Sequence, residues 1–90
     1  MLVIRLEENA MWGGTPLHEA LVLRLRQSGA LNAAAERGVS VYGAGGDGRS
    51  ITITAIEAEE KLWDIIPVVR AMAPKAMIAL LDAEVVAIAS

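Results

Sequence analysis

The spacing of hydrophobic residues predicts three strands in the first two thirds of the chain. Hydrophobic side chains recur at every second position of Leu2–Leu6 and of Ile51–Thr54, which is the period of a strand with one buried face. Val39–Tyr42 is rich in β-favouring side chains, and Gly43–Gly48 is the strongest turn signal in the sequence. We therefore expect the second and third strands to form a hairpin around that loop.

Two segments have the longer hydrophobic period of an amphipathic helix. The first is predicted to begin with Thr15 as N-cap and Pro16 at the first helical position, and to end at Gly29 as a left-handed cap. The second covers Glu57–Met72, where Pro67 predicts a kink or an early end. The expected apolar faces are Leu17, Ala20, Leu21 and Leu25 in the first helix, and Leu62, Ile65, Ile66, Val69 and Met72 in the second.

The remaining segments connect or follow these elements. Glu7–Gly14 is predicted to be a loop, while Ala30–Ala35 fits either a helical stretch or a connection. Met77–Leu81 and Glu84–Ala89 are apolar enough to form one long bent strand, or two short strands around Asp82.

The order of these elements predicts an α+β fold of the ferredoxin-like βαββαβ kind. In this arrangement an antiparallel sheet carries both helices on one face, and the other face stays uncovered. A chain of 90 residues is expected to form one domain, residues 1–90.

The composition adds an argument for self-association. Hydrophobic residues make up 54% of the chain and its mean hydropathy is +0.45. A domain this small buries only about 60% of the surface of its unfolded chain, so part of its apolar surface needs another partner. We expect a homo-oligomer that uses the uncovered sheet face.

The sequence argues against a membrane span, a signal peptide and a nucleic-acid partner. A membrane span needs ~18–20 apolar residues in a row, and the runs Ala76–Leu81 and Val85–Ala89 are short; charges inside the apolar N-terminal stretch argue against a signal peptide. The chain has no cysteine, which fits a reducing compartment, and the cytoplasm is the expected location. With a net charge of −3 and dispersed arginines, no nucleic-acid partner is expected.

The sequence offers little material for catalysis. His18 is the only histidine, and both general-base catalysis and zinc binding need further groups around it. Glu19 is adjacent in sequence, but neighbouring residues of a helix do not face each other. We therefore expect a structural or interfacial His18, no enzyme activity, no metal site and no cofactor.

The glycine-rich segment Gly43–Arg49 is the candidate ligand site. Successive backbone N–H groups of such a loop can form an anion-binding nest, and an arginine beside it can hold a phosphate. The alternative is a hairpin loop whose glycines serve only the turn, since the segment matches neither a Walker A loop nor G-x-G-x-x-G before a helix. The candidate ligand-binding residues are Arg37, Gly43, Gly45, Gly46, Gly48 and Arg49.

Trp12 precedes the glycine pair before the first helix. Either Gly13 or Gly14 is expected to adopt a positive φ, so that the indole packs beside its own helix or against a neighbouring subunit. The alternative role for this segment is a lid over a ligand.

Several of these motifs together resemble the PII-like family of domain of unknown function 190. The first motif is Trp12-Gly13-Gly14-x-Pro16-Leu17-x-Glu19-Ala20, followed by Leu25-Arg26 and Gly29; the second is Arg37-Gly38-Val39-Ser40-Val41-Tyr42-Gly43. A weaker similarity continues through Glu59-Glu60-Lys61-Leu62 and Ile66-Pro67 to the last strand.

The resemblance implies a regulatory role. Related PII signal-transduction proteins are trimers that bind adenine nucleotides between subunits and contact a target protein with a long loop between the second and third strands. Here that connection, Gly43–Ser50, is short. The expected function is a trimeric PII-like sensor that binds an anionic ligand such as an adenine nucleotide and regulates a target protein. The alternative is an oligomeric scaffold or protein-interaction module without a small-molecule ligand.

Overall fold

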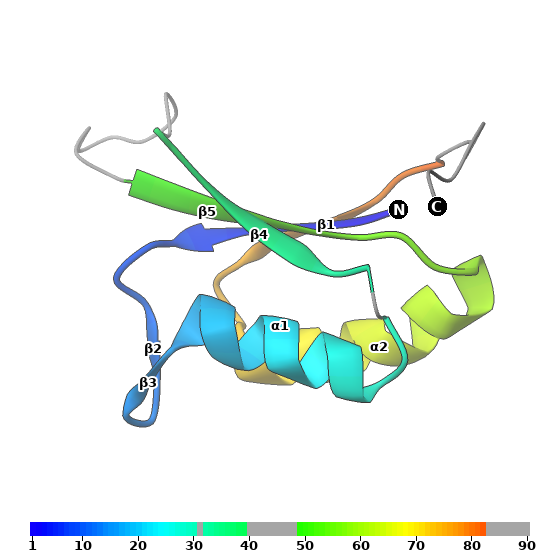
Figure 1. Ribbon diagram of the computed structural model, residues 1–90, viewed down its shortest axis with the longest axis horizontal. Coiled ribbons are helices and arrows are strands. Elements are labelled where there is room, and N and C mark those ends of the chain that lie inside the picture. Colours follow the sequence, from blue (N-terminus) through cyan, green and yellow to red (C-terminus); the bar gives the residue numbers. More distant parts are fainter. Residues whose placement is uncertain (31, 40–48, 83–90) are drawn as a thin grey trace.

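The computed structural model describes residues 1–30, 32–39 and 49–82, and it has a layer of strands on one side and a layer of two helices on the other (Figure 1). In chain order the elements are β1 (Leu2–Glu7), β2 (Met11–Trp12), β3 (Thr15–Pro16), α1 (Leu17–Gln27), β4 (Ala34–Val39), β5 (Arg49–Ala55), α2 (Glu59–Met72) and β6 (Met77–Leu80). Among the described residues, no helix is both long and apolar enough to cross a membrane.

The main sheet has four strands in the order β4-β5-β1-β6, and every neighbouring pair is antiparallel. The first strand of the chain therefore lies between the third and the last long strands, and β4 and β6 form the edges. Both helices lie on one face of this sheet (Figure 1). This arrangement confirms the α+β, ferredoxin-like prediction.

The core lies between the sheet and the helices. In β1 and β5 every second side chain is buried, as the period-two pattern predicts. Helix α1 contributes Leu17, Leu21 and Leu25 to the same layer. Fully burying one side chain of this size contributes ~1.5–3 kcal/mol. The largest fully buried side chains are Leu2, Ile4, Leu21, Leu25, Ile51, Ile53, Leu62 and Val69.

The start of α1 differs from the sequence prediction. The helix begins at Leu17 after Pro16 and has no side-chain cap, so the predictions of Thr15 as N-cap and of Pro16 as the first helical residue are wrong. Thr15 instead pairs with Trp12 in a two-residue hairpin within the predicted loop region. The backbone N–H of Leu17 donates to the carbonyl of Ala10 at 2.8 Å, so the backbone satisfies a donor that a cap would otherwise serve.

The end of α1 confirms the predicted glycine cap. Gly29 has φ +101°, and its N–H donates to the carbonyl of Arg26 at 3.1 Å. The N–H of Ala30 donates to the carbonyl of Leu25 at 2.9 Å. These two bonds form a Schellman motif, which satisfies helix carbonyls through a left-handed residue.

Helix α2 starts two residues later than predicted and does not end early. It continues past Pro67 to Met72, so of the two alternatives predicted for Pro67 the early end is wrong, while the kink stays a prediction. Ile66 and Met72 are only half-buried, and Leu62, Ile65 and Val69 are the residues of this helix that reach the core. The packing of these core residues outweighs the helix-breaking effect of one proline.

The second long strand begins earlier in the chain than predicted. Ala34 and Ala35 belong to β4, because pairing with β5 outweighs the weak strand preference of alanine. The expected pairing between this strand and the Ile51–Thr54 segment is confirmed. The glycine loop and the predicted strand Glu84–Ala89 lie outside the described residues.

Candidate functional site

The two arginines predicted to bind an anion lie at the same end of the sheet. Arg37 in β4 pairs with Ile51, and Arg49 pairs with Val39 two positions away. Because paired residues share a face and residues two apart also do, both arginines belong to the face that carries the helices. Gly43, Gly45, Gly46 and Gly48 lie outside the described residues.

Glu8 joins β1 to this end of the sheet. Its carboxylate lies 3.1 Å from Nε of Arg37, and its backbone N–H donates to the carbonyl of Arg49 at 3.0 Å. The Arg37 side chain is 74% exposed, so water screens this ion pair. An incoming anion would compete with Glu8 for Arg37, which the sequence alone does not indicate.

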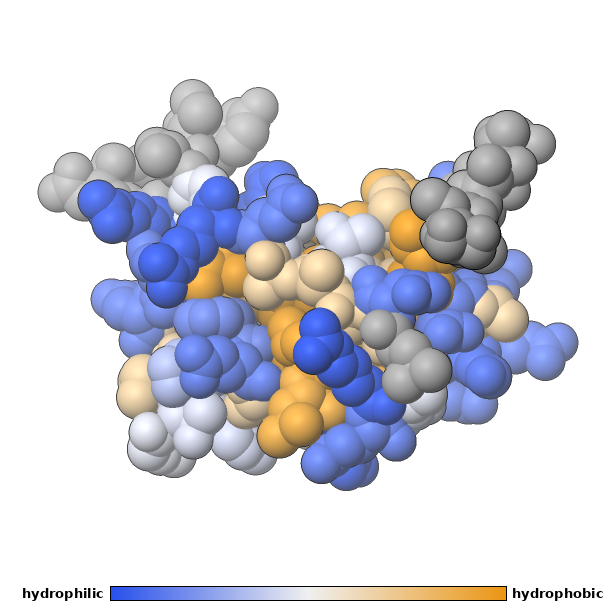
Figure 2. Space-filling model, viewed as in Figure 1, coloured by the Kyte–Doolittle hydropathy of each residue, from blue (hydrophilic) through white to orange (hydrophobic). Residues whose placement is uncertain are grey.

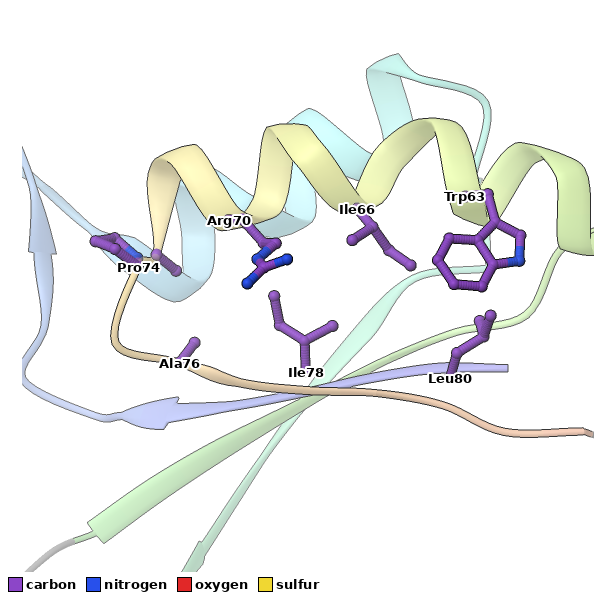
Figure 3. A pocket seen from close by; sticks show the side chains of 8 residues that line it. Trp63, Ile66, Arg70, Pro74, Ala76, Ile78 and Leu80 are labelled. Carbon is purple, nitrogen blue, oxygen red and sulfur yellow. The ribbon is translucent and has the colours of Figure 1, made fainter.

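A groove lies at the opposite edge of the fold, between α2 and β6 (Figure 3). It has a volume of about 370 Å³. Trp63, Ile66 and Arg70 point into it from the helix, while Ile78 and Leu80 point toward them from the strand. The groove therefore combines an apolar lining with one cation and one aromatic ring.

Two further hollows extend this groove along the same edge. One of about 330 Å³ shares Ala73, Pro74 and Ala76 with the groove and continues to Met11. The other, of about 300 Å³, shares Leu80 with the groove and includes Leu81 and Asp82. These adjoining hollows also contain acidic residues, Glu7 in the first and Glu57, Glu59 and Asp82 in the second, and we call only the hollow between α2 and β6 the β6 groove.

The sheet face without helices has one row of small, weakly apolar side chains. In the pairing of the strands, Val3 lies between Thr54 and Ala79, and Ala34 lies beyond Thr54. This row crosses all four strands and contains no charge. It is the part of the open face best suited to direct packing against another subunit.

The next row of the open face is polar. Arg5 lies between Thr52 and Met77, and Glu36 lies beyond Thr52. Arg5 and Glu36 are thus two strands apart and have opposite charges. Such a row contributes little to affinity, but it restricts how a second sheet can be oriented.

The glycine pair before α1 follows the sequence prediction in part. Gly13 has φ +59°, as expected for one of the two glycines. Trp12 is 46% exposed, so its ring is not buried as in a core, and its contact with a neighbouring subunit stays a prediction. His18 is half-buried, and its Nδ1 is buried without a hydrogen-bond partner among the described residues.

Sequence reasoning missed the residues of the β6 groove. Trp63 and Arg70 lie one position after the core residues Leu62 and Val69, so they belong to a second stripe along α2. The second stripe, Trp63, Ile66 and Arg70, has helical spacing, so it could have been recognised in the sequence. It is difficult to separate from the adjacent core stripe, which has the same period. Within the described ranges, no group of three metal-ligating side chains comes together.

Comparison with known proteins identifies the family but no activity. A search of curated proteins finds no match. The sequence model of the family DUF190, described as "Uncharacterized ACR, COG1993", matches residues 1–85. This match covers nearly the whole chain and includes each motif on which the resemblance was based. The chain therefore belongs to the PII-like family DUF190.

Proposed function

We propose that this protein is a PII-like regulatory sensor: a homotrimer that binds an anionic small ligand, such as an adenine nucleotide, between its subunits. The observation that carries the proposal is the family match over residues 1–85 on a ferredoxin-like fold in which no described element covers the second face of the sheet. Its proposed role is to sense a ligand and regulate a target protein, without catalysis. The cytoplasm is the proposed compartment, which a chain without cysteine fits.

The uncovered sheet face supports the trimer. Its uncharged row around Val3 can pack against another subunit, while Arg5 and Glu36 set the orientation. Light scattering at micromolar concentration should give about three times the chain mass of 9.5 kDa. A monomer across the concentration range would remove this part of the proposal.

The loop end of the sheet supports the anion site. Arg37 and Arg49 lie there on one face, at the two ends of the glycine-rich connection. Charge-assisted hydrogen bonds from an arginine are worth about 1.5–3 kcal/mol. Arg49→Ala should therefore weaken binding ~10-fold or more, while Lys61→Ala, an exposed residue of α2, should leave it unchanged.

A thermal-shift series with ATP, ADP, AMP and a cyclic nucleotide tests the ligand. A ligand present at 100 times its dissociation constant stabilises the folded state by about 2.7 kcal/mol. We expect at least one nucleotide to raise the melting temperature in a concentration-dependent way. If none does so at millimolar concentration, the ligand-binding proposal is wrong.

The second candidate function is an oligomeric scaffold without a small-molecule ligand. The contact between Glu8 and Arg37 favours it, because a carboxylate already compensates one of the two cations at the loop end. In that case the trimer would form, but no nucleotide would shift the melting temperature. The same two measurements therefore separate the two functions.

A further inference from the structure

Helix α2 has two stripes of side chains that face the sheet, one fully buried and one partly exposed. The first faces the core and comprises Leu62, Ile65 and Val69. The second points into the β6 groove and comprises Trp63, Ile66 and Arg70 (Figure 3). Trp63 is 57% exposed, although a tryptophan is among the most costly side chains to leave in water. The Trp63 indole N–H donates to Oε1 of Glu59 at 3.3 Å, and Ile66 is half-buried, but the stripe still leaves much apolar surface exposed beside the groove.

In the part of the chain that the structure describes, no strand pairs with the outer edge of β6, which lies directly below this stripe. The N-terminal amino group of Met1 donates to the carbonyl of Leu81 at 2.6 Å, and the N–H of Leu81 donates to the carbonyl of Met1 at 2.8 Å. Bonding alternates along an antiparallel pair. Ile78 and Leu80 therefore direct their N–H and C=O groups away from β1, toward the free edge.

An additional strand fits this edge. It would bond to Ile78 and Leu80, and every second side chain would enter the groove beneath α2. Tryptophan and arginine are the residues that most often dominate the binding energy of an interface. A strand with apolar side chains and one carboxylate near Arg70 would match the groove in shape and charge.

We propose that this strand is Glu84–Ala89 of a second copy of the chain. Residues 83–90 lie outside the described part, and their sequence is Ala-Glu-Val-Val-Ala-Ile-Ala-Ser. Five of the six residues in the segment are hydrophobic, and the one charged residue is an acid, which complements Arg70, the charged side chain that lines the groove between α2 and β6. As a strand, six residues span about 20 Å, enough to cover β6.

We assign the segment to a second copy, because a chain that leaves β6 at Leu81 would need a sharp reversal to pair with its own β6. The paired bonds between Met1 and Leu81 keep β6 extended to Leu81. Residues 80–90 contain no glycine, asparagine or proline, and Asp82, which favours turns, is followed by alanine and not by the glycine of a tight hairpin turn. A contact from the end of one subunit to the groove of the next is head-to-tail, and it can close into a ring. This contact does not depend on a nucleotide ligand.

Disulfide trapping in the full-length chain tests the proposal, because the natural sequence has no cysteine to complicate the result. Ile78→Cys is combined in turn with Val85→Cys, Val86→Cys or Ala87→Cys, and oxidised protein is run on a non-reducing gel. Neighbouring strands bring Cα atoms to about 5.5 Å, within the range of a disulfide. We expect bands of linked chains that alternate along the segment: strong for positions 85 and 87 and weak for 86, or the reverse.

Ala35→Cys in place of Ile78→Cys is the matched control. Ala35 lies on the other edge strand, β4, and, like Ile78, it pairs with a buried isoleucine of a central strand. It should give no linked chains with any of the three partners. If Ile78→Cys prevents folding, Leu80→Cys presents the same edge. A disulfide within one chain, equal linking at all three positions, or no linking at all would each overturn the proposal. Loss of nucleotide binding would leave these bands unchanged, so failure here and failure of the proposed function are distinguishable.

Discussion

The two edges of the sheet differ in how they are protected. The edge strand β4 contains Glu36, Arg37 and Gly38, and Arg37 pairs with Glu8. The edge strand β6 reads Met-Ile-Ala-Leu and has no charged residue. Charges and glycine on an edge strand discourage pairing with another chain, whereas an uncharged edge permits it. The β4 edge therefore carries features that discourage pairing with another chain, whereas the β6 edge has no charged residue that would prevent it.

Both sides of the molecule carry some apolar surface, but it is arranged differently beside the two edges. On the side of β4 and α1, hydrophilic surface flanks a central strip of hydrophobic surface (Figure 2). On the side of β6 and α2, the groove is lined by Trp63, Ile66 and Leu80 in addition to Arg70. Apolar surface thus occurs on both sides, and at the β6 edge it lines a groove beside a strand without charged residues.

The largest effect should come from placing a charge on each edge in turn. Ile78 and Ala35 are matched positions, because each faces the helices and pairs with a fully buried isoleucine, Ile4 or Ile53. Ile78→Asp removes a half-buried apolar side chain and puts a carboxylate into the groove, which should cost about 3 kcal/mol. Ala35→Asp, at an exposed position, should change stability by less than ~0.5 kcal/mol.

Urea unfolding at a fixed protein concentration measures both free energies. Equal costs for the two variants would show that the edges are equivalent and would remove the contrast. The circular-dichroism spectrum of each variant in the absence of urea serves as the control for native secondary structure.

The contrast also explains which parts of the fold could be predicted from the sequence. β1 and β5 are central strands with one buried face, so their hydrophobic period is strict and the prediction was confirmed. Gly29 was predictable because few other residues adopt its φ of +101° at a helix end. The small β2–β3 hairpin was not, since Thr15 and Pro16 also match a helix start and only pairing with Met11–Trp12 decides between them.

The candidate site was less predictable, because it depends on contacts between distant segments. The sequence suggests Arg37 as a ligand residue, but its contact with Glu8 arises only when β4, β5 and β1 are side by side. Trp63 and Arg70 were not singled out for a shared role, since their stripe is recognisable only after the core stripe of α2 is assigned. The buried face of a helix can be recognised from the sequence of that helix alone. A groove depends on residues from segments that are distant in the sequence.

A smaller effect is expected from strengthening the β4 edge. Gly38 has an ordinary φ, and a Cβ built on it meets nothing within 4 Å. Gly38→Thr should stabilise the fold by about 0.5–1 kcal/mol, because it removes the entropy cost of glycine and pairs a threonine with Ser50. Gly13→Thr is the matched control: its Cβ also has open space, but φ is +59°, so a loss of stability is expected.

Thermal unfolding of the two glycine variants shows whether each substitution stabilises or destabilises the fold. If Gly38→Thr also increases self-association, as light scattering would reveal, then glycine at this position protects the edge. A loss of stability in Gly38→Thr would contradict the assignment of this residue to a regular strand.

The smallest effect is expected from the ion pair that borders the β4 edge. Arg37→Gln should cost only ~0.2–1 kcal/mol, because the side chain is 74% exposed and exposed ion pairs contribute little. The cost should shrink further as salt is raised, since ions screen exposed charges, whereas the cost of Ile78→Asp should persist. A double-mutant cycle with Glu8→Gln isolates the pair from the separate effects of each side chain. A coupling above ~2 kcal/mol, or one that is insensitive to salt, would mean that the pair stabilises the β4 edge as strongly as packing stabilises β6.

Glu8→Gln alone also tests the anion site. Because it frees Arg37, this variant should bind a phosphate compound at the loop end more tightly, and it should leave binding unchanged if Arg37 takes no part.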